Sequence, residues 1–286
     1  ESESRGLGDV YKRQAIYDSS YYLISDSLST PNEAEKLKPV LVAAHGFSAS
    51  AWQLQELRDF ADSTGKFLVS LVTLGGHGTD YNDFKNSTWK DWQKPIITEY
   101  EKLIGLGYQN ISLLGASTGG TLILEGLHNH KFSQAPQNIF LIDPIIIPGD
   151  KILSLADWVN PILGNDVSPQ KGKERNHTYS NRPVEALDQL TTLINQVRID
   201  LEDGWKLPVG TQAQTWKAKI DASADPLSAL VIKRGLHLSD GSATEVKLVE
   251  SNKHIFIQSN NRSSWSEEQK QLQQKTFAEI QEQLIN

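Results

Sequence analysis

The chain has 286 residues and a formal net charge of −7 at pH 7, and it contains neither cysteine nor methionine. Its length fits one large α/β domain, and an acidic chain with scattered basic residues argues against a nucleic-acid partner or an anionic membrane surface. The lack of cysteine excludes disulfides, thiol catalysis and thiolate metal sites. No apolar run approaches the roughly 18 residues of a membrane span, so none is predicted.

The first residues of the chain form a polar tail. Residues 9–14, DVYKRQ, resemble the translation of a transposon end that is used to prepare sequencing libraries. We therefore expect residues 1–14 to be a non-native tail on a fragmentary environmental reading frame, and we leave them out of fold reasoning. An ordinary polar tail is the alternative. A signal peptide lost with the natural start would leave no trace, so the compartment stays open.

From residue 39 onward, strand-like apolar runs alternate with helix-like amphipathic runs. Strands are predicted within residues 39–46, 67–72, 110–115, 138–143, 213–220 and 244–251. Helices are predicted at residues 50–65, 87–107, 118–130, 182–204, 226–235 and 266–285. This alternation indicates an α/β fold with a mostly parallel sheet and helices on both faces. Residues 144–180 interrupt it with four prolines, which favours a cap insertion in a single domain spanning residues 15–286.

A serine stands where one of these strands turns into a helix. The apolar run 111–114 ends in Gly-Ala-Ser-Thr-Gly-Gly, and a helical run follows at once. Gly-x-Ser-x-Gly in this setting is typical of a nucleophile elbow, in which a sharp turn exposes the hydroxyl. The amides of the following helix favour negative charge that develops beside it. The pattern predicts Ser117 as a nucleophile; the alternative is a glycine-rich turn with no chemistry.

A serine nucleophile needs a base, and the base needs an acid that orients it. The histidines after Ser117 are His128, His130, His177, His237 and His254. The first two end the helix that starts at the serine, the third lies in the insertion before any candidate acid, and the fourth precedes the surface turn SDGS. His254 follows the last predicted strand, at the sheet edge where open α/β folds bind ligands. It is the predicted base.

Two aspartates are candidates for the acid, both in the segment KAKIDASADPLSALV. Asp221 directly follows a predicted strand, which is the place of a residue that contacts the base. Asp225 precedes Pro226 and a helix, and this is the pattern of an N-cap followed by proline at the first helical position. The functional interpretation fits Asp221, and the structural one fits Asp225.

Acyl transfer also needs hydrogen-bond donors for the oxyanion. One is the backbone N–H of the residue after the nucleophile, here Thr118, and the other comes from the loop after an early strand. The segment HGFSAS at residues 45–50 places the Phe47 N–H in that role. His45 and His77 precede the serine and are interpreted as loop-packing residues.

The segments HGFSAS, LGGHG, GASTGG, KAKIDASADPLSA and NKHIFI occur together in an order and spacing similar to those of the α/β-hydrolase superfamily. Within it, the chain resembles bacterial carboxylesterases and monoacylglycerol lipases. The resemblance runs from about residue 38 and is weakest in residues 144–180, the cap that sets substrate choice in this group. It implies Ser117, Asp221 and His254 as the triad. Thr118 departs from the Met or Leu of many relatives, but only its backbone N–H has a role.

The resemblance implies a serine carboxylic-ester hydrolase that works through an acyl-enzyme, without a cofactor or metal. The expected partner is a small-molecule ester, either of small to medium chain length or a monoacylglycerol, with no nucleic acid and with monomer or homodimer left open. Trp158, Leu153 and Leu155 of the insertion are candidates for an apolar acyl site, or else pack on the body. Alternatives are amide or lactone hydrolysis, acyl transfer, or a ligand-binding protein on a hydrolase scaffold.

Overall fold

The computed structural model describes residues 30–149, 165–167, 177–179, 181–259 and 265–286. The tail predicted at residues 1–14 lies outside them. So do the three candidates for the acyl site, Trp158, Leu153 and Leu155. These assignments stay predictions, as does the division into a single domain with a cap at residues 144–180.

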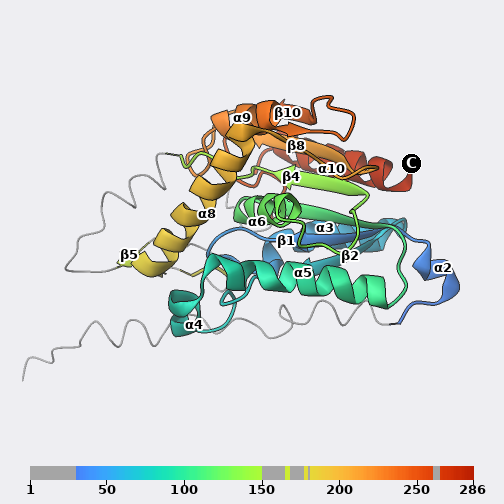
Figure 1. The fold of residues 1–286 in the computed structure, drawn as a ribbon, viewed down its shortest axis with the longest axis horizontal. Helices are drawn as coiled ribbons and strands as arrows, with labels where there is room; N and C mark the ends of the chain where they lie inside the picture. Colours follow the sequence, from blue (N-terminus) through green and yellow to red (C-terminus); the bar gives the residue numbers. More distant parts are fainter. Residues whose placement is uncertain (1–29, 150–164, 168–176, 180, 260–264) are drawn as a thin grey trace, which may run out of the picture.

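The centre of the structure is a six-stranded sheet in which every pair of neighbours is parallel, in the order β10-β8-β4-β3-β1-β2 (Figure 1). Its strands are β1 (Val40–Ala44), β2 (Leu68–Val72), β3 (Ile111–Ala116), β4 (Asn138–Ile142), β8 (Gln212–Ala218) and β10 (Glu245–Val249). Four of them lie within strands predicted from the sequence, whereas β3 ends one residue later and β8 begins one residue earlier than predicted. Every residue of β1, β3 and β4 is buried, as expected where helices cover both faces of a parallel sheet.

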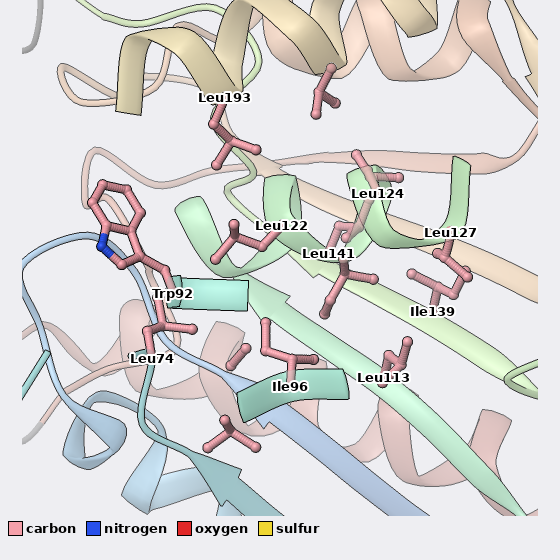
Figure 2. Close-up of a cluster of buried hydrophobic side chains, with 14 of the residues drawn as sticks. Leu74, Trp92, Ile96, Leu113, Leu122, Leu124, Leu127, Ile139, Leu141 and Leu193 are labelled. Atoms are coloured by element: carbon pink, nitrogen blue, oxygen red, sulfur yellow. The ribbon is translucent and has the colours of Figure 1, made fainter. Parts of the chain in front are cut away.

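Helices lie on both faces of this sheet (Figure 1). One apolar cluster joins the sheet to η3 (Ala51–Leu54), α3 (Gln55–Thr64) and α10 (Glu267–Ile285). The cluster on the opposite face includes residues of α4 (Tyr81–Asn86), α5 (Trp89–Gly105), α6 (Thr118–His128), α8 (Val184–Asp203) and α9 (Leu227–Gly235). In Figure 2, side chains of α5, α6 and α8 converge with Leu113 of β3 and Leu141 of β4. The sheet is therefore the middle of three layers.

Smaller elements surround this body. A short helix, α2 (Glu33–Lys36), precedes β1, and two small sheets pair β5 (Asn165–Val167) with β6 (Asn181–Pro183) and β7 (Trp205–Lys206) with β9 (Leu236–His237). The β5–β6 pair is antiparallel, and β5 lies in the interval predicted as an insertion. Pro183 is the residue before α8 rather than part of its first turn, so the helix begins slightly later than the sequence pattern indicated.

The turn between β3 and α6 is packed so closely that its glycines have no substitute. A Cβ on Gly119 would lie 2.4 Å from the carbonyl oxygen of Ala44 and 2.7 Å from that of His45. A Cβ on Gly115 would lie 2.3 Å from the backbone nitrogen of Gly120. Because these neighbours are backbone atoms, relief would require β1 or α6 to shift. The two glycines of the Gly-x-Ser-x-Gly motif are therefore required for packing in this fold.

We predict that Gly119→Ala lowers the free energy of unfolding by about 1–3 kcal/mol or more, the range for overpacking a filled interior. Gly105→Ala, at the end of α5, is the matched control, because a Cβ there would meet nothing within 4 Å. It should leave stability unchanged or raise it by up to about 1 kcal/mol. Urea unfolding midpoints measure both, and equal midpoints for the two variants would contradict the packing explanation.

Candidate active site

The functional candidates all follow strands of the parallel sheet at the same edge. Ser117 follows β3, Asp221 lies beyond β8 and His254 lies beyond β10, while Phe47 follows β1. In a parallel sheet the carboxyl ends of all strands meet at one edge, where open α/β folds bind their ligands. The fold thus brings together Ser117 and His254, which are 137 positions apart in the sequence.

Ser117 occupies a strained turn. Its backbone has φ +51° and ψ −118°, a conformation that costs a residue with a side chain of the order of 1–3 kcal/mol. The turn is held by a hydrogen bond from the Ser117 N–H to the carbonyl of Ile142 at 2.9 Å. The surrounding structure therefore keeps the hydroxyl at the start of α6 and at the edge of the sheet.

The structure joins the three predicted triad side chains by hydrogen bonds. Nε2 of His254 lies 2.9 Å from the Ser117 Oγ, and Nδ1 of the same ring lies 2.7 Å from Oδ2 of Asp221. These distances allow a proton to pass from the hydroxyl to the imidazole while the carboxylate fixes the opposite ring nitrogen. No additional movement is needed to form the contacts.

Asp221 is held in place from several sides. Its Oδ1 accepts hydrogen bonds from the N–H groups of Ser223, at 2.8 Å, and Ala224, at 3.1 Å. Burial alone raises the pKa of this carboxyl, but the hydrogen bond and charge of His254 and the ammonium of Lys217 outweigh it and hold the pKa well below its usual range. Asp221 is thus ionised at neutral pH.

Asp225 has a different role in the structure. Its Oδ1 accepts the N–H of Leu227 at 2.8 Å, and its carbonyl accepts the N–H of Ser228 at 2.9 Å. These bonds satisfy donors at the start of α9. The helix begins at Leu227 with Pro226 as its N-cap, so Asp225 lies one position before the cap that the sequence pattern assigned to it. The geometry separates the two aspartates: Asp221 contacts the imidazole, and Asp225 stabilises the start of a helix.

Sequence reasoning missed two charged residues at this site, Asp143 and Lys217. The Lys217 ammonium is fully buried and lies 2.5 Å from Oδ2 of Asp221 and 3.3 Å from Oδ1 of Asp143. Both residues belonged to predicted strands and received no role. A lysine inside a predicted strand of a sheet covered on both faces, four residues before a candidate acid, is the signal that could have shown them, since buried lysines are rare unless paired.

A pocket of about 350 Å³ opens at this edge of the sheet. Ser117, His254, Phe47 and Thr118 all line it. In the described part of the chain, the Phe47 N–H donates no backbone hydrogen bond, and Thr118, as the first residue of α6, has no intrahelical acceptor for its own. The other described polar residues of the lining are Ser48, Gln53, Thr178, Arg182, Ser223, Asn252, Lys253 and Gln258.

No protein-family model matches the chain. A thermostable monoacylglycerol lipase of Bacillus sp. strain H-257 is 28% identical over 174 residues, which cover 60% of this chain and 68% of that protein. A carboxylesterase of Bacillus subtilis is 24% identical over 163 residues, covering 55% of this chain and 64% of that protein. The matches thus span about two thirds of each relative's length.

Solved structures align over most of the chain. A soluble variant of monoglyceride lipase from Saccharomyces cerevisiae, in complex with a substrate analogue, aligns with a TM-score of 0.68 at 12% identity. The alignment covers 90% of this chain and 89% of that one. The parallel strand order and the serine elbow after β3 agree with this likeness.

The chain has the α/β-hydrolase fold. The resemblance of its sequence pattern to bacterial carboxylesterases and monoacylglycerol lipases agrees with the names of the two relatives. In the described part of the chain, no helix is long and apolar enough to cross a membrane.

Two histidines near this edge of the sheet are buried and pack against their neighbours. Nδ1 of His45 lies 2.8 Å from the Gly46 carbonyl, and its Nε2 accepts the Leu74 N–H at 3.0 Å, which requires a neutral ring. The His77 ring lies against the rings of Phe84 and Trp92, at centroid distances of 4.7 and 5.3 Å. Burial lowers the pKa of His45 to about 4 and that of His77, which also faces His45, to about 3.

The remaining histidines lie elsewhere. His128 of α6 lies 3.2 Å from the Asp200 carboxylate, the His177 ring stacks on Trp52 at 4.0 Å, and His237 lies on β9. His130 is exposed just past α6. Of the five histidines that follow Ser117 in the sequence, the structure therefore brings only His254 to the serine, as the sequence predicted.

Because His45 and His77 stay neutral when folded, the unfolded chain takes up their protons first as the pH falls below about 6.5. Stability is complete above that pH and falls by about 1.4 kcal/mol per pH unit for each histidine, until the pH reaches the folded pKa. We predict that His77→Phe, which fits the aromatic surroundings, makes the free energy of unfolding less dependent on pH. Between pH 6.2 and 5, the dependence should fall by the contribution of one histidine, about 1.4 kcal/mol per pH unit. Urea unfolding across that range measures it. His130→Asn is the control, and an unchanged slope in His77→Phe would contradict the assignment.

Proposed function

We propose that this α/β hydrolase is a serine carboxylic-ester hydrolase that acts through an acyl-enzyme. The observation that carries the proposal is the continuous chain of contacts from the Ser117 hydroxyl through His254 to Asp221, located at the wall of a pocket. A structural network would have no need to aim a strained serine at a histidine in the wall of a pocket. The names of the two relatives, a monoacylglycerol lipase and a carboxylesterase, support the reaction class.

The reaction begins when His254 accepts the proton of the Ser117 hydroxyl through Nε2. The serine oxygen then attacks the ester carbonyl, and the negative charge that develops on the carbonyl oxygen is stabilised by the N–H groups of Phe47 and Thr118. The protonated His254 gives its proton to the leaving alcohol, which releases the alcohol and leaves an acyl group on the serine.

Water then removes the acyl group. His254, neutral again, accepts a proton from the water as it attacks the acyl carbonyl, and returns that proton to the Ser117 oxygen as the acid leaves. Throughout, Asp221 accepts a hydrogen bond from Nδ1 of His254. This contact holds the ring in the tautomer that leaves Nε2 free to accept a proton, and it stabilises the ring once it is charged.

The proposed substrates are carboxylic esters of small to medium chain length or monoacylglycerols. The described lining of the pocket is rich in polar side chains, which fits a substrate with a polar alcohol such as glycerol. Trp158, Leu153 and Leu155 remain the candidates for an apolar acyl site. Turnover of nitrophenyl esters of increasing acyl length tests the class, and a binding protein on this scaffold would release at most one nitrophenol per chain.

The proposed function predicts the effect of removing the nucleophile. Ser117→Ala should lower kcat by about 10⁴-fold or more, because the triad acts as a unit, and should abolish labelling by a fluorophosphonate probe. Ser223→Ala, which changes another serine that lines the pocket, is the control and should keep both activity and labelling. Retained labelling in Ser117→Ala would show that the nucleophile is elsewhere.

The proposed function also predicts different effects for the two aspartates. Asp221→Asn should lower kcat by about 10⁴-fold, because the amide no longer selects the correct tautomer of His254. It should also cost some stability, since Lys217 keeps only one of its two carboxylates. Asp225→Ala should keep most activity and lose on the order of 1 kcal/mol of stability with its hydrogen bond to the start of α9. Measurements of kcat and of urea unfolding midpoints for both variants should show that only Asp221→Asn loses its activity. Loss of activity in a folded Asp225→Ala variant would reverse the assignment.

A further inference from the structure

The triad acid shares a buried lysine with a second carboxylate. Lys217, on β8, has no exposed side-chain surface, and its ammonium contacts both Asp221 and Asp143, whose side chains are equally buried. Burial of three charged groups is costly, and a pair of apolar residues of similar volume is often as stable. Packing alone therefore gives no reason for the arrangement.

Asp143 also holds the segment that carries the base. It follows β4 with a φ of +46°, and its Oδ1 accepts the Ala218 N–H at 2.7 Å. Its Oδ2 accepts the N–H of Ile255, the residue after His254, at 2.8 Å. Ile255 itself has a φ of +54°, which is unfavourable for a β-branched residue. Asp143 therefore stabilises a strained turn that sets the position of His254.

The charges of this cluster combine in a definite way. Asp143 and Asp221 each contribute one negative charge and Lys217 one positive charge, so the three groups together carry −1. This is the charge that a single triad acid would present to the imidazole. With Lys217 but without Asp143, the acid would be neutralised; with Asp143 but without Lys217, two carboxylates would face the base. The second carboxylate thus compensates for the lysine.

We propose that Lys217 and Asp143 are positioning residues of the hydrolase, which together fix the His254 turn and set the net charge that His254 experiences at −1. The proposal rests on the proposed function, because it assigns these residues through the base and the acid of that reaction. Neither residue touches the reacting atoms: Lys217 acts through Asp221, and Asp143 acts through Lys217 and the backbone beside His254.

Other charged groups surround His254 and stay constant in the test. Lys253 precedes it in the same turn, and Arg182, from β6, lines the same pocket. Asp221 contacts the ring directly. Since these groups are left unchanged, differences between variants report the charges of Lys217 and Asp143.

The test is a double-mutant cycle in the full chain, in which each variant changes the net charge of the cluster; we call it the charge cycle. Lys217→Gln leaves −2 on the two carboxylates and should stabilise the imidazolium, which moves the acidic limb of kcat/KM to higher pH. Asp143→Asn leaves a net charge of zero and should move the limb to lower pH. Each shift should be on the order of one pH unit, as expected for a unit charge a few ångströms away in a protein interior. The double variant restores −1 and should return the limb close to its original position.

A second measurement covers variants with little activity. The pH titration of the His254 ring, followed by NMR with ¹⁵N-labelled histidine in a Ser117→Ala background, should give the same opposite shifts and the same return. If circular dichroism shows that Lys217→Gln does not fold, Lys217→Met takes its place, because a buried apolar side chain of similar length is tolerated better. Shifts in the same direction, or loss of kcat without any shift, would overturn the proposal.

The controls separate this inference from the proposed function. If Ser117→Ala hydrolyses esters at the rate of the unaltered chain, the proposed function is wrong, whatever the charge cycle gives. If Ser117→Ala is inactive and the NMR titration shows no opposite shifts, the proposed function stands and the role of Lys217 and Asp143 is wrong.

Discussion

The parallel direction of the six strands is the constraint on which the site depends. Because neighbouring strands run the same way, their carboxyl ends all open on one edge, and each loop there begins from a fixed point. The serine, the imidazole and the carboxylates arrive on different strands, yet their hydrogen bonds form without long connecting loops. Crossover helices supply the two outer layers, and these layers keep the strands buried and therefore rigid.

At this edge the chain handles charge in two ways. His45 and His77 are buried and kept neutral, so that they pack like aromatic residues and add no net charge at this edge. The carboxylates, in contrast, are buried and charged, and they are stabilised by backbone N–H groups and by one lysine. A buried charge is tolerated only with partners of this kind. The two solutions lie next to each other at the edge where the strands end.

The sequence was sufficient to predict the sheet, the helices on both faces and the residues that meet at the edge. Those predictions rest on local signals: the apolar runs, the glycines around Ser117, and the position of His254 directly after a strand. The roles of Asp143 and Lys217 depend instead on contacts between β4, β8 and the turn after β10. Such contacts join residues that are distant in sequence. The lysine inside a predicted strand is a local sign that a partner exists, but it does not identify Asp143. The acyl site stays a prediction, since its candidates lie outside the described residues.

The position of β10 has a consequence for how the site is lost. Among the described residues, this strand is at the border of the sheet and pairs with β8 alone, whereas β3, which carries the serine, has partners on both sides. Edge elements open at a lower free-energy cost than central ones. Fraying of this one strand would move His254 away from Ser117 while the turn after β3 stays intact. The hydrogen bond from the Ile255 N–H to Asp143 opposes this opening.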